Sequence, residues 1–413
     1  MPPATLPQSV SPAALEPPGA AFTSSPEFDL LLACCAECSN RQRAERIREI
    51  LACQLDWERL IQLAEHHGVV PQVFRRLSAA TDVAPSSPLE TIRQHYVANA
   101  RQTLWLTREL LRILEHLESH GIAALPYKGP VLAEILYGNV ALRQFSDLDV
   151  LIRAADMPKI KAALVELGYE PGVELMQREE RAYLASGYEY TFDSAHGRNL
   201  LEMQWQILPR FYSVDFDVDG FFDRAVLVSV GGQPIHTLCA EDLILVLCVH
   251  AAKHVWVQLS WLCDIAELAR SRQCDWDAVQ KYASRLGIER VVAVTFLLAY
   301  KLLGTPLPAI VQNRLQADHT IEALVDQILL IIAESAEYNT ESIPYFRLMM
   351  DLRERRWDRV RFLWRLVLTP SVAEWSAIRL PGPLLPLYRV VRAGRLAKRS
   401  WHLIRNSLHV YYL

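Results

Sequence analysis

Asp147 and Asp149 stand one residue apart in the stretch RQFSDLDVLI, residues 143–152. On a β-strand their side chains point to one side, while Leu148 and Val150 point into the core. Two carboxylates this close repel each other unless a cation lies between them. Hard oxygen ligands at this spacing suit Mg²⁺, which also binds substrate phosphates. Because D-x-D is also common on exposed strand edges, the pattern alone predicts either a metal site or two surface charges.

Two further stretches favour the metal site. The sequence YKGP, residues 127–130, lies between an expected strand and an expected helix, so backbone N–H groups at the helix N-terminus are placed to receive a phosphate. Lys128 adds a positive charge there. The sequence LLEMQW places Glu202 on a strand that we expect to neighbour the strand of the aspartates. Neighbouring strands lie about 4.8 Å apart, so Glu202 is expected to reach the same ion.

Glu189 and Asp193 compete with Glu202 for the place of the third acid. Asp193 falls at an expected hairpin tip, where Asp is a turn former, and Glu189 alternates with apolar neighbours on a strand. We favour Glu202, because its strand is the more apolar and a buried acid needs a partner.

The elements that position these residues change character along the chain. Residues 1–27 are rich in Pro and Ser and predict a disordered tail. Residues 28–120 show helical spacing, residues 121–238 alternate short strands and helices, and residues 239–413 return to helices. The expected class is α+β, with a small mixed-sheet domain flanked by N- and C-terminal helical regions.

These features together resemble the nucleotidyltransferase superfamily that shares its catalytic domain with DNA polymerase beta. The resemblance is closest to a bacterial branch known as the uncharacterised nucleotidyltransferase family. It rests on Lys128-Gly129, Tyr137-Gly138, Arg143 and DLDVLI in this order, and it extends over roughly residues 28–400.

The resemblance implies transfer of a nucleoside monophosphate from an NTP, expected to be ATP, to a hydroxyl-bearing acceptor, with release of pyrophosphate. Asp147 and Asp149 would hold the Mg²⁺ of the nucleotide, and both together with Glu202 would hold a second Mg²⁺. Glu202 is alternatively a general base. The residues expected to bind the nucleotide are Lys128, Gly129, Arg143, Ser146 and Lys253.

Two departures from the family pattern leave a second interpretation open. Pro130 removes one N–H donor from the expected phosphate cradle. Gln204 stands where the family commonly has a histidine before the tryptophan. The alternative to an enzyme is therefore a nucleotide-binding or scaffold protein that kept the fold and lost the chemistry. The acceptor, whether small molecule, protein or tRNA, is not determined by the sequence.

The C-terminal region is locally basic although the formal net charge of the chain is −4. Its arginines and lysine alternate with tryptophans: Arg353, Arg355, Arg356, Arg359, Arg361, Arg365, Arg389, Arg392, Arg395, Lys398 and Arg399, with Trp357, Trp364, Trp375 and Trp401. We interpret this region mainly as a solvated face over a packed stripe. Binding of nucleic acid, including a tRNA acceptor, is the alternative.

Composition and the remaining polar residues give expectations about membrane spans, the redox state of the cysteines and the roles of the histidines. Hydrophobic residues make up 51% of the chain, and no apolar run is long enough to predict a membrane span. The eight cysteines form no spaced framework, so we expect reduced thiols in a cytoplasmic protein, with Cys35 and Cys38 as packing residues. His250 and His254 are expected in core or supporting roles, and Asp264 is expected to bond to His254 or Lys253.

Overall fold

A computed structural model gives the fold of the chain. It describes residues 25–36, 39–80, 84–173, 175, 177–194, 197–271, 274–335, 338–339, 342–369, 378, 384 and 387–395. The expected disordered tail, Cys38, Trp375, Lys398, Arg399 and Trp401 lie wholly or largely outside these residues. No helix among the described residues is both long and apolar enough to cross a membrane.

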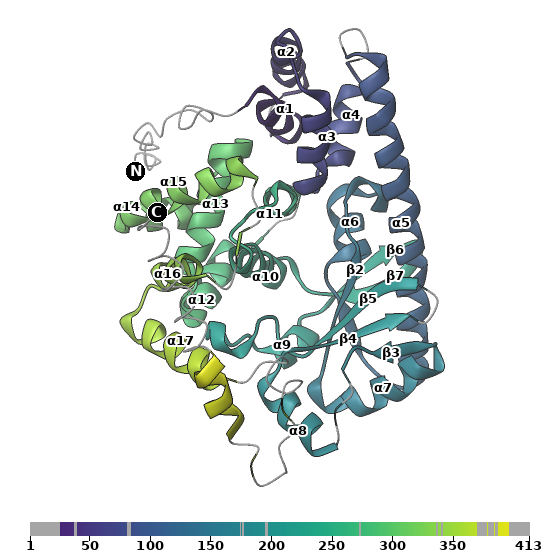
Figure 1. Ribbon diagram of the computed structural model, residues 1–413, viewed down its shortest axis with the longest axis vertical. Helices are drawn as coiled ribbons and strands as arrows, with labels where there is room; N and C mark the ends of the chain where they lie inside the picture. The colour runs from purple at the N-terminus through teal and green to yellow at the C-terminus, as the bar shows by residue number, and fades with distance from the viewer. Residues whose placement is uncertain are drawn as a thin grey trace, which may run out of the picture.

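Among the described residues, five helices precede the first strand, as can be followed in Figure 1, and polar caps fix where several of them begin. They are α1 (Pro26–Cys35), α2 (Asn40–Leu51), α3 (Trp57–His66), α4 (Val70–Leu77) and α5 (Ser86–Ser119). Ser25 accepts a hydrogen bond from the backbone N–H of Phe28, so α1 starts two residues before the expected boundary. Asp56 caps α3 by accepting a hydrogen bond from the N–H of Arg59 at 3.0 Å.

A mixed five-stranded sheet forms the centre of the molecule and confirms the α+β class. Its strands are β1 (Ala124–Pro126), β2 (Asp147–Ile152), β3 (Tyr169–Pro171), β4 (Glu189–Ser194) and β5 (Gly197–Gln204), in the order β1-β2-β5-β4-β3. β2 and β5 are parallel, whereas the other neighbouring pairs are antiparallel. The intervening helices are α6 (Gly129–Tyr137), α7 (Met157–Glu166) and α8 (Gln177–Ser186). The three expected acids therefore lie on two adjacent strands, Asp147 and Asp149 on β2 and Glu202 on β5.

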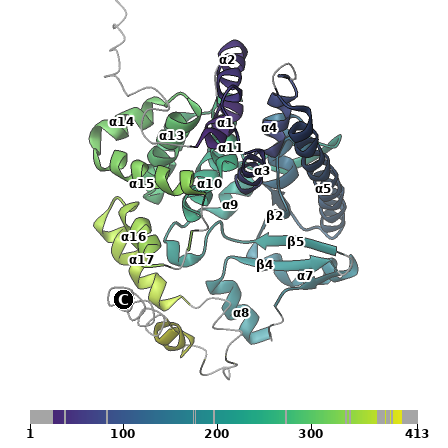
Figure 2. The same cartoon turned by 45° about the horizontal axis from the view of Figure 1, so that its top comes forward.

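The two faces of the sheet have different surroundings, as the alternation along β2 requires. Leu148, Val150 and Ile152 join a core built with apolar residues of α5 and α7. Leu151, on the same side as the aspartates, belongs to a second core that includes residues of α10 (Ala240–Lys253). Both views of the molecule show the sheet between α5 on one side and α10 on the other (Figures 1 and 2).

The remaining elements follow the sheet along the chain. They are α9 (Val218–Asp223), the hairpin β6 (Val226–Val230) and β7 (Gln233–Thr237), then α11 (Leu259–Ser271), α12 (Trp276–Leu286), α13 (Glu289–Leu303), α14 (Ala309–Ala317), α15 (Thr320–Glu334), α16 (Ile343–Asp351) and α17 (Arg356–Leu368). Residues of α1, α3 and α4 share one hydrophobic core with residues of α10, α11 and α13. The helices before and after the sheet thus pack together above the polar face.

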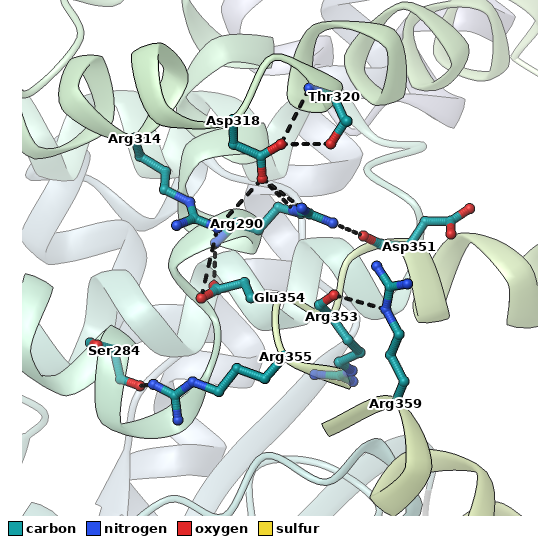
Figure 3. A network of polar contacts seen from close by, with 10 residues as sticks. All are labelled: Ser284, Arg290, Arg314, Asp318, Thr320, Asp351, Arg353, Glu354, Arg355 and Arg359. Atoms are coloured by element: carbon teal, nitrogen blue, oxygen red, sulfur yellow. Dashed lines mark hydrogen bonds and ion pairs between the residues drawn. The ribbon is translucent and has the colours of Figure 1, made fainter. Parts of the chain in front are cut away.

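Arginines of the C-terminal region take part in structural contacts, several of which Figure 3 shows. Arg290 of α13 donates to Asp318 at 2.9 and 2.6 Å from its Nε and Nη2 atoms, and Glu354 accepts from its backbone N–H. Arg355 donates to the carbonyl of Ser284. Arg353 is only 5% exposed. Trp357 and Trp364 are 70% and 68% exposed, so the structure differs from the expected solvated face over a packed stripe: an arginine is buried and two of the tryptophans are not.

Candidate active site

The parallel pairing of β2 with β5 brings the acidic side chains together. Asp149 lies directly opposite Glu202 in the register, and Asp147 lies opposite Leu200. Paired residues of adjacent strands point to the same face of a sheet, so Asp147, Asp149 and Glu202 share the polar face. Asp149 is 4% exposed and therefore needs compensating partners. Glu202 thus lies where we expected the third acid.

Gln204 connects two of these acids through a single amide group. Its Nε2 donates to Asp149 Oδ1 at 3.1 Å and to Glu202 Oε2 at 2.8 Å. Its Oε1 accepts a hydrogen bond from the hydroxyl of Tyr127, which fixes the orientation of the amide. Gln204 is 3% exposed, so its polar atoms are held by protein groups. The residue that departs from the family pattern orients the acids.

Lys128 and Gly129 lie at the start of α6, directly against the acidic pair. The ammonium group of Lys128 is 3.0 Å from Asp149 Oδ1. Gly129 has a positive φ of 54°, and a Cβ atom there would lie 3.4 Å from the carbonyl oxygen of Asp147. No side chain caps the N-terminus of α6. The turn therefore places a positive charge and free backbone donors beside the acids, despite Pro130.

Burial and mutual repulsion raise the pKa values of the acids. Burial raises the pKa of Asp147, and the neighbouring Asp149 raises it further. Burial raises the pKa of Glu202 to about 8, with the charges of Asp149 and Glu189 next in effect. The pKa of Glu189 is also raised by burial, although hydrogen bonds from Tyr188 and with Glu202 oppose the shift. The positive charge around these acids is too small to offset burial and mutual repulsion, so their ionised forms are disfavoured.

Glu189 and Asp193, the competing acids, lie in different places. Glu189 pairs with Gln204 in the β4–β5 register, and its side chain interacts with that of Glu202, so it belongs to the cluster. Asp193 is exposed. It pairs with Glu170 of β3, the edge strand at the end of the sheet farther from β2. Glu189 is therefore a fourth acid of the site, and Asp193 lies outside it.

A cavity of about 440 Å³ opens in front of Asp147 and Asp149. It lies between the sheet and helices that precede and follow the sheet in the chain, among them α3, α5, α10 and α11. Its lining residues are Glu65, Gly68, Asn99, Lys128, Arg143, Gln144, Phe145, Ser146, Asp147, Asp149, His250, His254, Gln258, Ser260 and Trp261. Ser146 is exposed, as a residue that contacts a ligand must be. Glu202 and Lys253 are not among the lining residues.

A strained turn after α10 lies between two residues that line the cavity, His254 and Gln258. Val255 and Trp256 have positive φ values of 56° and 51°, which are rare for a β-branched and a bulky residue. Both are fully buried, and the indole Nε1 of Trp256 donates to Thr295 Oγ1 at 3.0 Å. Such strain persists only where the surroundings impose it, and it is typical of functional sites. The turn leads into Gln258, which lines the cavity.

His250 and His254 line the cavity, where we expected core or supporting roles. Their rings lie 4.9 Å apart, and the rings of both contact Trp261. Burial lowers the pKa of His254 to about 3, and it lowers the pKa of His250 well below its usual value. Both imidazoles are therefore neutral near pH 7 and offer hydrogen bonds instead of charge.

The partners of Asp264 differ from those that we expected. It pairs with Arg143, whose Nε lies 2.9 Å from Oδ2, and it accepts from the hydroxyl of Tyr137 at 2.9 Å. The expected partners, His254 and Lys253, are wrong because α11 packs against α6 and turns Asp264 toward that helix. Arg143 lines the cavity as a cation already compensated by Asp264.

Lys253 lies near Tyr188 and the acids, and it is not among the residues that line the cavity. Its ammonium group is 5.2 Å from the centre of the Tyr188 ring. Burial lowers its pKa, whereas the charge of Glu189 opposes that shift. Lys253 is thus placed to balance the buried acids, and contact with a nucleotide stays a prediction.

Sequence reasoning missed the residues that the flanking helices bring to the cavity. Glu65 and Asn99 come from α3 and α5, and Gln258 and Trp261 come from the turn and helix after α10. None of them belongs to a local motif, and the sequence contains no signal that distinguishes them from surface residues. Their contribution depends on how helices far apart in the chain pack over the sheet.

Comparisons with known proteins give one match that covers more than half of the chain. The model of a family described as "uncharacterised nucleotidyltransferase" matches residues 54–304. No protein of curated function is similar enough to be matched.

Four solved structures are similar over part of the chain. One is ANT(2")-Ia in complex with adenylyl-2"-tobramycin, with 14% identity, a TM-score of 0.33, and coverage of 44% of this chain and 98% of that one. Another is the lincosamide antibiotic adenylyltransferase LnuA with lincomycin bound, with 17% identity, a TM-score of 0.29, and coverage of 40% and 97%. A third is an antigenic nucleotidyltransferase-like protein from Paracoccidioides brasiliensis, with 13% identity, a TM-score of 0.29, and coverage of 44% and 86%. Similarity this low supports no inference about substrate.

Proposed function

The chain belongs to the uncharacterised nucleotidyltransferase family, and from this premise we propose that it transfers a nucleoside monophosphate from a Mg²⁺-bound NTP to a hydroxyl-bearing acceptor, releasing pyrophosphate. Asp147, Asp149 and Glu202 are the proposed ligands of the metal. ATP is the proposed nucleotide. The acceptor is proposed to enter the cavity in front of the two aspartates.

The observation that supports this proposal is an excess of negative charge among buried groups. The interacting ionisable side chains are Asp147, Asp149, Glu189, Glu202, Lys128 and Lys253. Four carboxylates facing two ammonium groups leave two negative charges when all are ionised, since Arg143 is compensated by Asp264. A divalent cation removes that excess, and oxygen ligands are those that Mg²⁺ prefers. The residues present therefore fit the ion that the family implies.

When bound, Mg²⁺ neutralises charge on the phosphates and lowers the pKa of an attacking hydroxyl. The chain's own groups supply position and charge. Lys128 and the first N–H groups of α6 are placed to hold phosphate oxygens, because they lie beside Asp149 at an uncapped helix N-terminus. Phosphoryl transfer depends mainly on such positioning and charge neutralisation, so few other groups are required.

Glu202 has a second proposed role as a general base. Its pKa of about 8 lies close to neutral pH, where a carboxylate both accepts a proton readily and is partly ionised. Binding of the cation would lower that pKa and favour the role of metal ligand. The two roles predict different consequences for Glu202→Gln. If Glu202 is a metal ligand, the variant should lose Mg²⁺ affinity. If Glu202 is the general base, the variant should lose turnover even at saturating Mg²⁺.

The proposal is tested by incubating the protein with each α-labelled NTP, Mg²⁺ and cell extract. We expect a labelled product and released pyrophosphate, both reduced about 10³-fold or more by Asp149→Asn, because metal-mediated charge stabilisation contributes several kcal/mol. The matched control is Asp193→Asn, which removes an exposed acid of β4 and should leave labelling unchanged.

The scaffold alternative predicts a different result in the same experiment. If the wild-type protein binds NTP without forming a labelled product, and Asp149→Asn changes only that binding, the chain is a nucleotide-binding scaffold. If no nucleotide binds or is transferred under any condition, the proposed function is wrong. A cytoplasmic location, where NTPs are available and the seven described cysteines would stay reduced, is part of the proposal.

A further inference from the structure

A second cluster of metal-binding side chains lies on the far side of the sheet from the cavity, where the C-terminal ends of α5 and α7 meet. It consists of His116 in the last turn of α5, His120 at the C-cap of α5, and Glu166, the last residue of α7. The two histidines are four residues apart, so they lie on one face of the helix. The site proposed for nucleotide transfer uses none of these residues.

The distances within this cluster match those of a metal site. His116 Nε2 is 3.2 Å and His120 Nε2 is 3.5 Å from the same oxygen, Oε2 of Glu166. A tetrahedral ion with bonds of about 2.0–2.1 Å holds its donor atoms about 3.3–3.4 Å apart. The three ligand atoms all lie within 4.8 Å of one another. One small ion can therefore reach all three with little movement of the side chains.

The opposite nitrogen of His120 is held as it is in metal-binding histidines. Its Nδ1 lies 2.9 Å from the carbonyl oxygen of His116 and 3.2 Å from Ser119 Oγ. A carbonyl oxygen only accepts hydrogen bonds, so Nδ1 carries the proton and Nε2 of the neutral ring presents a lone pair toward Glu166. A lone pair facing a carboxylate is repulsive unless a cation or a proton lies between them.

His116 and the C-terminal ends of the two helices also favour a positive charge at this place. His116 Nε2 is buried and has no hydrogen-bond partner of acceptable geometry among the described residues. The C-terminal ends of α5 and α7 both carry partial negative charge, which favours a cation at their meeting point. Hence three independent features of the cluster call for positive charge.

We propose that His116, His120 and Glu166 bind a first-row divalent transition ion, with Zn²⁺ as the expected metal. Two imidazoles and one carboxylate suit Zn²⁺ better than Mg²⁺, which prefers oxygen ligands throughout. The three protein ligands leave a fourth position for water. Because the ligands come from two helices that cover the same face of the sheet, the ion would tie the end of α5 to α7.

The test is a titration of the metal-free full-length protein with Zn²⁺, and with Co²⁺ for its absorption spectrum, in excess Mg²⁺ to fill the carboxylate site. We expect one Zn²⁺ equivalent to bind and the melting temperature to rise. His120→Ala and Glu166→Gln should each weaken Zn²⁺ binding by at least about tenfold and remove the tetrahedral Co²⁺ spectrum.

Two controls separate this cluster from other sites. His95→Ala removes another histidine of α5, half-buried and paired with a single glutamate, Glu65, and should leave Zn²⁺ affinity unchanged. Asp149→Asn should also leave it unchanged, so failure of the catalytic proposal would not affect this result. Equal Zn²⁺ affinity in wild type, His120→Ala and Glu166→Gln would overturn the proposal and assign the cluster to a protonated histidine–glutamate ion pair. Absence of Zn²⁺ binding to the wild-type protein would overturn it equally.

Discussion

Gln204 shows how a neutral side chain organises charged ones. One amide NH₂ group reaches both Asp149 and Glu202, while the hydroxyl of Tyr127 prevents the amide from turning over. In a buried site such an arrangement is fixed before any ligand arrives, because each polar atom has only one set of partners. We therefore regard Gln204 as a positioning residue for the acids.

Replacing Gln204 should weaken Mg²⁺ binding at the proposed site without unfolding the protein. For Gln204→Ala we expect the Mg²⁺ concentration at half-maximal activity to rise by about 10–100-fold, the usual effect of removing a group that orients metal ligands. Tyr127→Phe should produce a smaller shift in the same direction, because the amide stays but its orientation is free. Mg²⁺ titration of activity measures both. An unchanged Mg²⁺ requirement in Gln204→Ala, with lower turnover only, would contradict the positioning role.

The raised pKa of Glu202 predicts how the stability of the metal-free protein depends on pH. The folded-state pKa is about 8, above the ordinary value of 4.5, so the folded protein binds more protons than the unfolded chain between these values. Its stability should therefore fall as pH rises from about 5 through 8. Mg²⁺ should restore stability at the upper end of that range.

Thermal melts across this pH range, with and without Mg²⁺, provide the measurement. In Glu202→Gln the decline should be shallower, because the titrating group is gone while the shape is kept. A decline of the same depth in Glu202→Gln and wild type would assign the pH dependence to other groups.

At the scale of elements, α6 begins beside Asp149, which Lys128 contacts, and ends at Tyr137, whose hydroxyl donates to Asp264. Glycines with positive φ flank the helix: Gly129, with φ of 54°, at its start and Gly138, with φ of 62°, after its end. A Cβ atom at Gly129 would lie in van der Waals contact with the carbonyl oxygen of Asp147, at 3.4 Å, whereas one at Gly138 would meet nothing within 4 Å. The two positions share the same backbone strain and differ in contact with the site.

This difference provides a matched pair of variants. Gly129→Ala and Gly138→Ala should each cost about 1–2 kcal/mol of stability for the left-handed conformation. Only Gly129→Ala should also raise KM for the NTP, because relief of the backbone strain at this position would move the N–H groups that we propose to hold the phosphate. Chemical denaturation and steady-state kinetics separate the two effects. Equal kinetic changes in both variants would show that α6 acts through stability alone.

At the scale of the whole molecule, α10 and α11 join the sheet to helices from both ends of the chain. Asp264 on α11 holds Arg143, 121 residues earlier, so the segment that leads into β2 is fixed by a helix from the C-terminal half. The cavity forms because this packing leaves a polar space over the acidic face. Cavity shape, and with it the choice of acceptor, is thus a property of the assembled molecule.

The basic C-terminal region provides a prediction at the same scale. Arg355 and Arg356 are exposed, whereas Arg361 and Arg365 form ion pairs with Asp215. We expect the double replacement of Arg355 and Arg356 by Ala to leave formation of the labelled product unchanged, because these residues lie on a solvated face.

The assay in cell extract described above measures this effect. Loss of a labelled RNA product in the double variant, with NTP binding intact, would instead favour a tRNA acceptor. Arg353→Ala is unsuitable for that purpose because the side chain is buried over Phe362 and its loss should destabilise the fold.

The local pattern of the sequence determined the acidic face of β2, the Lys128-Gly129 turn and the strand of Glu202, because a strand's two-residue period and a glycine's freedom are properties of neighbouring residues. The tertiary structure decided which partners these groups found. Gln204 meets Tyr127 across 77 residues, and Asp264 meets Arg143 instead of His254. Such contacts depend on how helices pack over the sheet, and packing is set by the combined shape of many apolar side chains, which no local spacing records.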